Sequence, residues 1–232
     1  MKSFLKPVAL LQYGAASAMR KVFSATIALI LTITPAIAEQ VTVAALGDSL
    51  TAGYGLPVEE GFVPQLQAWL RKRGHDVVVK NAGVSGDTTA GGLSRVDWTL
   101  TEDVDAVIVE LGANDMLRGL PPEAARDNLD RILKAIASRE LPVLLAGIPA
   151  PPNYGADYKS SFDAIFPDLG AQYDAIVYPN FLYGIGSAGD LPAVAALMQA
   201  DGLHPNAKGV ARIVEDIGPI VEELISRARQ KE

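Results

Sequence analysis

From residue 41 onward, short apolar runs of strand length alternate with segments in which apolar residues recur at helical spacing, and this pattern narrows the possible folds more than any other. It predicts parallel strands joined by crossover helices that cover both faces of a sheet. We therefore predict an α/β protein, a three-layer α/β/α domain with a central parallel sheet of about five strands. The candidate strands are residues 41–46, 76–80, 104–111, 142–148 and a weaker 175–178.

The first 38 residues differ from the rest of the chain, because they contain four basic residues and no acidic one. Residues 22–33 are largely apolar, and Ala36-Ile37-Ala38 follows them. Basic, apolar and small-residue segments in this order are typical of a secretory signal peptide. We predict that the signal peptide starts at Met19 and is cleaved after Ala38. Residues 1–18 are then either a basic extension or lie upstream of the start that is used.

This interpretation leaves residues 39–232 as one domain and predicts a periplasmic or secreted protein. The alternative is an uncleaved membrane anchor. It is disfavoured, because the apolar run is short and contains Thr and Ser. We expect no stable membrane anchor.

Composition excludes several classes of function. The formal net charge is −7 without basic clusters in the domain, which argues against nucleic acid as a partner. The chain has no Cys and only two His, so disulfides, a cysteine nucleophile and thiolate or His-rich metal sites are excluded. We predict no metal and no cofactor, and no obligate protein partner is evident.

Polar or glycine-containing segments follow the first three candidate strands. They are residues 47–50 (Gly-Asp-Ser-Leu), 81–88 and 112–115 (Gly-Ala-Asn-Asp), and a fourth segment, 201–205 (Asp-Gly-Leu-His-Pro), precedes the last helical pattern. Because the carboxyl ends of parallel strands meet at one edge of the sheet, these segments are expected to converge on one crevice.

Ser49 is a candidate nucleophile if a base reaches its hydroxyl. An imidazole can take the serine proton, and a carboxylate on the other ring nitrogen makes that imidazole more effective. Asp201 and His204 are three residues apart, so a tight turn can join the carboxylate to Nδ1 and leave Nε2 pointing outward. The alternative is that His204 only caps or packs the last helix.

Attack on a carbonyl also needs donors for the oxyanion. Gly86 offers a backbone N–H that no Cβ obstructs, and Asn114 offers a side-chain amide. Taken singly, each residue is better explained by a structural role, Gly86 in a turn and Asn114 in bracing a loop. Their shared position at strand ends favours the catalytic interpretation.

These four segments, in this order, resemble the four sequence blocks of the SGNH (GDSL) hydrolases. Residues 109–115, 117–120 and 152–155 further resemble the branch of periplasmic bacterial acyl-CoA thioesterases, lysophospholipases and arylesterases. The resemblance covers about residues 41–225 and implies a flavodoxin-like fold and a serine esterase or thioesterase acting on small-molecule acyl esters.

The resemblance implies a role for each matching position. Ser49 would be the nucleophile, His204 the general base and then acid, and Asp201 its orienting partner. The N–H groups of Ser49 and Gly86 and the amide of Asn114 would form the oxyanion hole. Asp48 is expected to brace the turn at Ser49 by hydrogen bonds. Candidate substrate-binding side chains near these positions are Met116, Leu117, Leu120 and Tyr154.

Two alternative functions are also compatible with these residues. One is a carbohydrate O-acetylesterase that uses the same residues on small acetyl esters. The other is a lipid- or glycan-binding module that retains the fold without turnover. The apolar side chains after Asn114 favour longer acyl groups over acetyl, although ordinary packing explains these side chains equally well.

Overall fold

The computed structural model describes Met1 and residues 40–186 and 191–231. The signal segment predicted for the first 38 residues, including its cleavage site, therefore lies outside the described residues apart from Met1. No helix in the described ranges combines the length and the apolar content needed to cross a bilayer.

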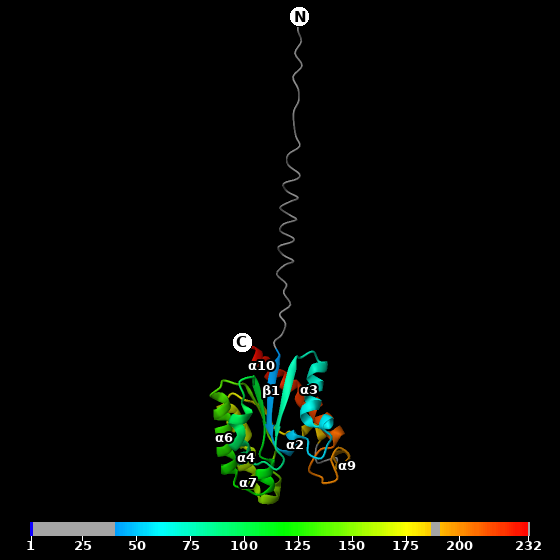
Figure 1. The fold of residues 1–232 in the computed structure, drawn as a ribbon. Helices are drawn as coiled ribbons and strands as arrows, with labels where there is room; N and C mark the ends of the chain where they lie inside the picture. The colour runs from blue at the N-terminus through cyan, green and yellow to red at the C-terminus, as the bar shows by residue number, and fades with distance from the viewer. Residues whose placement is uncertain (2–39, 187–190, 232) are drawn as a thin grey trace. The chain divides into compact units, whose positions relative to one another are not determined.

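Five parallel strands form a single sheet in the order β2-β1-β3-β4-β5, as the alternating pattern predicts (Figure 1). The strands are β1 (Val41–Gly47), β2 (Val77–Gly83), β3 (Ala106–Glu110), β4 (Val143–Ala146) and β5 (Ile176–Tyr178).

The predicted strand boundaries need correction at three strands. β2 continues to Gly83 because all seven residues of β1 pair with it. β3 and β4 are shorter than the predicted 104–111 and 142–148. Directly before β3, the N–H of Thr42 donates to the side-chain carboxylate of Asp105, at 2.7 Å.

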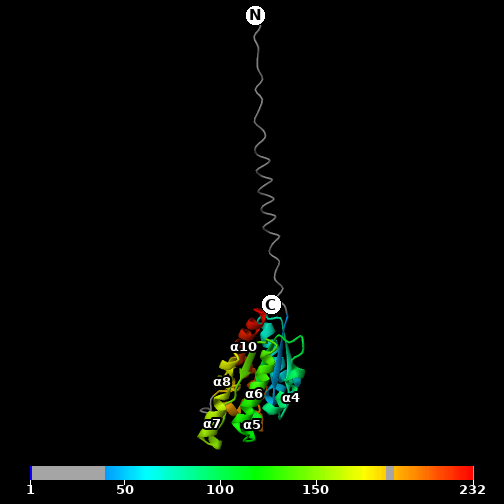
Figure 2. The same ribbon diagram turned by 90° about the vertical axis from the view of Figure 1, so that its left-hand side faces the viewer.

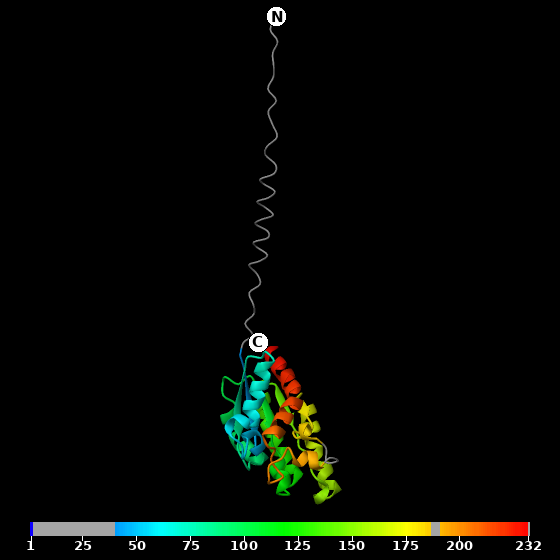
Figure 3. The same cartoon turned by 90° about the vertical axis from the view of Figure 1, so that its right-hand side faces the viewer.

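Helices cover both faces of the sheet. α3 and α10 lie on one face (Figure 3), and α4, α6 and α8 lie on the other (Figure 2). The helices are α2 (Ser49–Ala52), α3 (Phe62–Lys72), α4 (Thr89–Thr99), α5 (Ala113–Leu117), α6 (Pro122–Ala137), α7 (Ala156–Asp163), α8 (Ile165–Gln172), α9 (Leu191–Ala195) and α10 (Ala207–Arg229), with short 3-10 turns at Val58–Glu60, Pro152–Tyr154 and Tyr183–Ile185.

The sheet is buried on both sides. Val41, Val43 and Ala45 of β1 join the apolar cluster under α3 and α10, whereas Ala44 and Leu46 join the cluster under α4 and α6. Successive residues of a strand point to opposite faces, so a strand covered on both sides is continuously apolar rather than alternating. This is why β1 is an unbroken apolar run in the sequence.

The carboxyl ends of β1, β2 and β3 are level with one another. Gly47 pairs with Gly83 on one side and with Glu110 on the other. A Cβ on Gly47 would lie 2.0 Å from Oγ1 of Thr51, and one on Gly83 would lie 2.3 Å from the nitrogen of Ala52. The absence of side chains at these two positions lets α2 pack directly against the strand ends, which fixes the position of Ser49.

Candidate active site

Ser49, His204 and Asp201 form a continuous hydrogen-bonded chain. Ser49 is the first residue of α2, and its Oγ lies 2.9 Å from Nε2 of His204. The other ring nitrogen of His204, Nδ1, lies 2.7 Å from Oδ2 of Asp201. The structure thus brings together a hydroxyl and an imidazole that are 155 positions apart in the chain.

The turn that carries Asp201 and His204 is held by its own backbone. Oδ1 of Asp201 accepts hydrogen bonds from the N–H groups of Leu203 (2.9 Å) and His204 (3.0 Å). The hydrogen bond from the His204 ring, together with these two backbone donors, lowers the pKa of Asp201 to about 2. A carboxylate only accepts hydrogen bonds, so Nδ1 carries the proton and Nε2 is free to accept from Ser49.

The His204 ring also has an aromatic neighbour. The ring of Tyr54 packs against it with centroids 4.6 Å apart and a tilt of 40°. Tyr54 follows α2 and is half exposed, so it covers one side of the imidazole at the mouth of the site. Nothing in the sequence pattern around Tyr54 indicates this contact.

Asn114 reaches the site from α5, directly after β3. Its amide Nδ2 donates to Oδ2 of Asp48 at 3.1 Å. The next residue, Asp115, is buried and accepts from the N–H and the hydroxyl of Thr89, at 2.8 and 2.6 Å, which ties α5 to the start of α4. These bonds orient the Asn114 amide. Gly86 lies three positions beyond β2 with a φ of 86°, a conformation that favours glycine.

A buried pair of carboxyl groups lies behind the Ser49 turn. Asp48 and Glu110 are both almost fully buried, and their side chains share a hydrogen bond. Oδ1 of Asp48 also accepts from the N–H of Leu50 at 3.0 Å. Oε2 of Glu110 accepts from the hydroxyl of Thr51 at 2.9 Å and more weakly from the N–H of Asp48 at 3.4 Å.

Burial beside the negative charge of Asp48 raises the pKa of Glu110 well above its ordinary value. Each oxygen of Asp48 accepts a hydrogen bond, from Leu50 at 3.0 Å and from Asn114 at 3.1 Å, whereas both donors to Glu110 converge on Oε2 and one of them is weak at 3.4 Å. We therefore assign the negative charge to Asp48 and the proton to Glu110. Protonated Glu110 then donates to Asp48, and Asp48 in turn accepts from Asn114. Sequence reasoning missed Glu110, although a glutamate that ends an apolar strand is an unusual residue to bury.

The protonation of Glu110 predicts a pH-dependent stability difference. From about pH 4.5, the ordinary glutamate value, up to the raised pKa, only the unfolded chain releases this proton, so wild-type stability is expected to fall as pH rises through that window. In Glu110→Gln the amide donates to Asp48 but does not titrate. The free energy of unfolding in urea should therefore increase for Glu110→Gln relative to wild type between pH 5 and pH 8. If the two proteins showed the same dependence of this free energy on pH, the assignment of the proton to Glu110 would be contradicted.

Glu110→Ala is the companion variant. This substitution removes the hydrogen bonds that Glu110 makes with the Thr51 hydroxyl and the Asp48 carboxylate, and it opens a cavity. We therefore expect the free energy of unfolding to decrease by about 2–4 kcal/mol.

A cavity of about 410 Å³ opens next to Ser49 and His204. Met116 and Leu117 line it, as the sequence suggested for substrate-binding side chains, whereas Leu120 and Tyr154 are exposed and do not line it. The lining residues that the sequence did not indicate as catalytic or substrate-binding are Leu50, Ala113, Ile148, Pro149, Pro151, Asn180, Leu182, Met198, Gly202 and Leu203.

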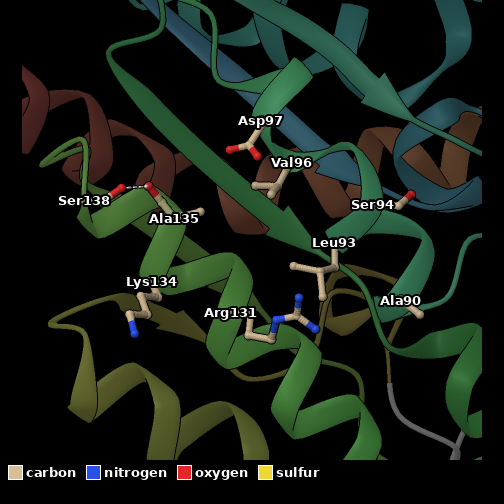
Figure 4. A pocket seen from close by; sticks show the side chains of 9 residues that line it. All are labelled: Ala90, Leu93, Ser94, Val96, Asp97, Arg131, Lys134, Ala135 and Ser138. Atoms are coloured by element: carbon tan, nitrogen blue, oxygen red, sulfur yellow. Dashed lines mark hydrogen bonds between the residues drawn. The ribbon is translucent and has the colours of Figure 1, made fainter.

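A larger cavity of about 720 Å³ lies away from these residues, between α4 and α6 (Figure 4). Its two serines bond to their own helices: Ser94 donates to the carbonyl of Gly91 at 2.7 Å, and Ser138 donates to that of Ala135 at 2.7 Å. Neither hydroxyl has a basic partner, so this groove lacks an activated nucleophile. Within the described residues, no group of three or more His, Cys, Asp or Glu side chains is placed to hold a metal ion.

Comparisons with known proteins agree with the geometry. The model of the GDSL-like Lipase/Acylhydrolase family matches residues 45–212. Esterase TesA of Pseudomonas aeruginosa is 38% identical over 203 residues, covering 87% of this chain and 97% of that protein. Thioesterase 1/protease 1/lysophospholipase L1 of Escherichia coli is 33% identical over 80% of this chain and 85% of that protein.

Among solved structures, the psychrotrophic esterase EstA from Pseudoalteromonas sp., inhibited by monoethylphosphonate, superposes with a TM-score of 0.72. It is 35% identical and the match covers 80% of this chain and 98% of that chain.

Proposed function

This chain belongs to the GDSL-like lipase/acylhydrolase family, and from that premise we propose that its hydrolase activity proceeds through an acyl intermediate on Ser49. The protein is a serine hydrolase of the esterase/thioesterase type found in this family. The observation that carries the assignment of residues is the chain of hydrogen bonds from Ser49 Oγ to His204 Nε2 (2.9 Å) and from Nδ1 to Asp201 (2.7 Å).

In the acylation step, Ser49 Oγ attacks the carbonyl carbon of the ester while Nε2 of His204 takes the hydroxyl proton. The carbonyl oxygen becomes an oxyanion and accepts hydrogen bonds from the N–H groups of Ser49 and Gly86 and from the Asn114 amide. The tetrahedral intermediate then collapses, the bond to the leaving oxygen or sulfur breaks, and His204 returns the proton to that atom.

In deacylation, a water molecule takes the place of the leaving group. His204 removes a proton from the water as it attacks the acyl carbon, and the bond to Ser49 Oγ breaks with return of that proton to the serine. In both steps the carboxylate of Asp201 stabilises the imidazolium. With its pKa lowered to about 2, Asp201 stays ionised throughout the neutral range.

The cavity beside Ser49 supports an acyl group longer than acetyl. Its walls are mainly apolar, and its volume of about 410 Å³ lies within the range of ordinary small-molecule pockets. Placing the acyl chain there points the leaving group toward the open mouth near His204, where the imidazolium can protonate it.

Two measurements test this function. A fluorophosphonate is expected to modify Ser49, which peptide mass spectrometry identifies. A series of p-nitrophenyl esters from acetate to decanoate, with matching thioesters, is expected to give kcat/KM values that increase beyond acetate. A strict preference for acetate would instead indicate an O-acetylesterase, and absence of turnover on every substrate would indicate a binding module.

We also propose that residues 19–38 are a signal peptide that directs export and that the domain of residues 39–232 acts in the periplasm or outside the cell. The order of basic, apolar and small residues supports this. Expression of the full chain in a Gram-negative host should yield an exported protein that begins at Glu39, as its intact mass will show. An exported protein that retains residues 19–38 would contradict cleavage after Ala38.

A further inference from the structure

Arg118 occupies an unusual electrostatic position. In the sequence it is the only Lys or Arg in the segments that connect the carboxyl ends of the strands to the main helices, although these segments contain several carboxylates. The segments are residues 48–61, 84–88, 111–121, 147–155 and 179–206. Among the Lys and Arg side chains, Arg118 is thus the one cation that these segments offer to an anionic ligand.

The guanidinium lies against the loop that carries Gly86. Nη2 of Arg118 donates to the carbonyl oxygen of Gly86 at 2.7 Å. A Cβ added to Gly86 would lie 3.7 Å from the same nitrogen. The backbone N–H of Arg118 donates to the carbonyl of Asn114 at 3.2 Å. Arg118 therefore sits next to two of the proposed oxyanion donors.

No carboxylate in the described part of the chain pairs with Arg118, and the one hydrogen bond leaves most of its five N–H donors free. The contrast with Arg95 is informative. Arg95 contacts the same loop, but its Nε binds Asp87 at 2.7 Å, and its other nitrogens bind the carbonyls of Ala82 and Gly47 at 2.6 and 2.8 Å. All three nitrogens of Arg95 bind groups of the protein, one of them a carboxylate, whereas Arg118 is exposed and has donors available to a ligand.

The segment that presents Arg118 is held from the opposite side. The hydroxyl of Tyr154 donates to the carbonyl of Leu117 at 3.2 Å, and that of Tyr158 donates to the carbonyl of Leu120 at 3.0 Å. These bonds fix the backbone on either side of Arg118. The side chain of Leu117 lines the cavity next to Ser49, so the guanidinium is attached one residue beyond the cavity wall.

We propose that Arg118 binds a phosphate group carried by the leaving group of the ester, and so makes the enzyme selective for phosphate-bearing acyl esters and thioesters. This inference rests on the proposed function. With the acyl chain in the cavity that Leu117 lines, the leaving group extends out of it, and the next residue, Arg118, holds its guanidinium beside Gly86. The planar fork of a guanidinium matches phosphate oxygens in geometry and charge.

Two sources supply this chemistry, a lysophospholipid and a coenzyme A thioester, and paired substrates separate them. The first pair is decanoyl lysophosphatidylcholine and monodecanoylglycerol, and the second is decanoyl-coenzyme A and the decanoyl thioester of N-acetylcysteamine. All are assayed below their micelle-forming concentrations. Within each pair, the ratio of kcat/KM values for the phosphate-bearing and the neutral member measures selectivity.

Arg118→Gln is expected to lower this ratio about tenfold, mainly through KM, for at least one pair. Arg118→Lys retains the charge and should preserve part of the ratio, and added salt should reduce the wild-type ratio. The matched control is Arg131→Gln, because Arg131 is an exposed arginine on α6, away from Ser49.

If the ratio of kcat/KM values is unchanged in Arg118→Gln for both pairs, the proposal is overturned. This holds even if the variant is slower on every substrate. An equal loss on neutral and phosphate-bearing substrates would indicate that Arg118 only holds the Gly86 loop. The pair that responds identifies the source of the phosphate. Failure of the proposed function is distinguishable, because the wild-type enzyme would then hydrolyse none of the four substrates.

Discussion

Ser49→Ala is expected to lower kcat for p-nitrophenyl esters by about four orders of magnitude or more while leaving the fold unchanged. In the proposed mechanism the acyl group is transferred to the serine hydroxyl oxygen, so alanine removes the covalent route. In the described structure the Ser49 hydroxyl bonds to His204 alone, at 2.9 Å. Alanine also favours a helix, so α2 should form as before. Steady-state kinetics and thermal unfolding of the purified variant test both expectations.

Ser94→Ala is the matched control for Ser49→Ala. Ser94 is an exposed serine on α4 whose hydroxyl binds the carbonyl of Gly91 in its own helix at 2.7 Å, and we expect wild-type rates from this variant. Adding His204→Ala to Ser49→Ala should cost almost nothing further, because the two side chains act as one unit. Wild-type turnover by Ser49→Ala, free of contaminating hydrolase, would contradict the assignment of the nucleophile.

The sequence alone could predict the elements of the site because of where parallel sheets place their ligands. Ser49 and Asn114 follow β1 and β3 directly, and the strands are level at their carboxyl ends through the pairing of Gly47 with Glu110. Once the β/α alternation is recognised, convergence of these residues follows from topology. The short spacing from Asp201 to His204 likewise predicts a local turn.

The walls of the cavity could not be predicted in the same way. Asn180, Leu182 and Met198 come from irregular segments after β5, where no periodicity indicates which side chains turn inward. Leu120 and Tyr154 are the opposite case, because the sequence predicted them as substrate-binding residues and they do not line the cavity. They are close to the site in sequence or motif, but the backbone turns their side chains outward, to relative exposures of 37% and 43%.

Asp201→Asn is expected to lower kcat about 10⁴-fold, nearly as much as loss of the nucleophile. The carboxylate of Asp201 accepts the Nδ1 proton of His204 at 2.7 Å and its second oxygen accepts from two backbone N–H groups, so both oxygens are committed as acceptors. An asparagine that keeps the backbone bonds must turn its NH₂ group toward Nδ1. The imidazole then carries its proton on Nε2 and cannot accept one from Ser49.

The pH dependence distinguishes this mechanism from a general loss of charge at the surface. The pKa of Asp201 is lowered to about 2, so the carboxylate is charged above that value, and wild-type activity should not be limited by its protonation at pH 4 or higher. The defect of Asp201→Asn should therefore be of similar size from pH 5 to pH 9. Asp168→Asn, which removes a half-exposed carboxylate paired with Arg126 at 2.9 Å, is the matched control and should retain full activity. A rate for Asp201→Asn within tenfold of wild type would mean that His204 is held in its catalytic tautomer by some other group.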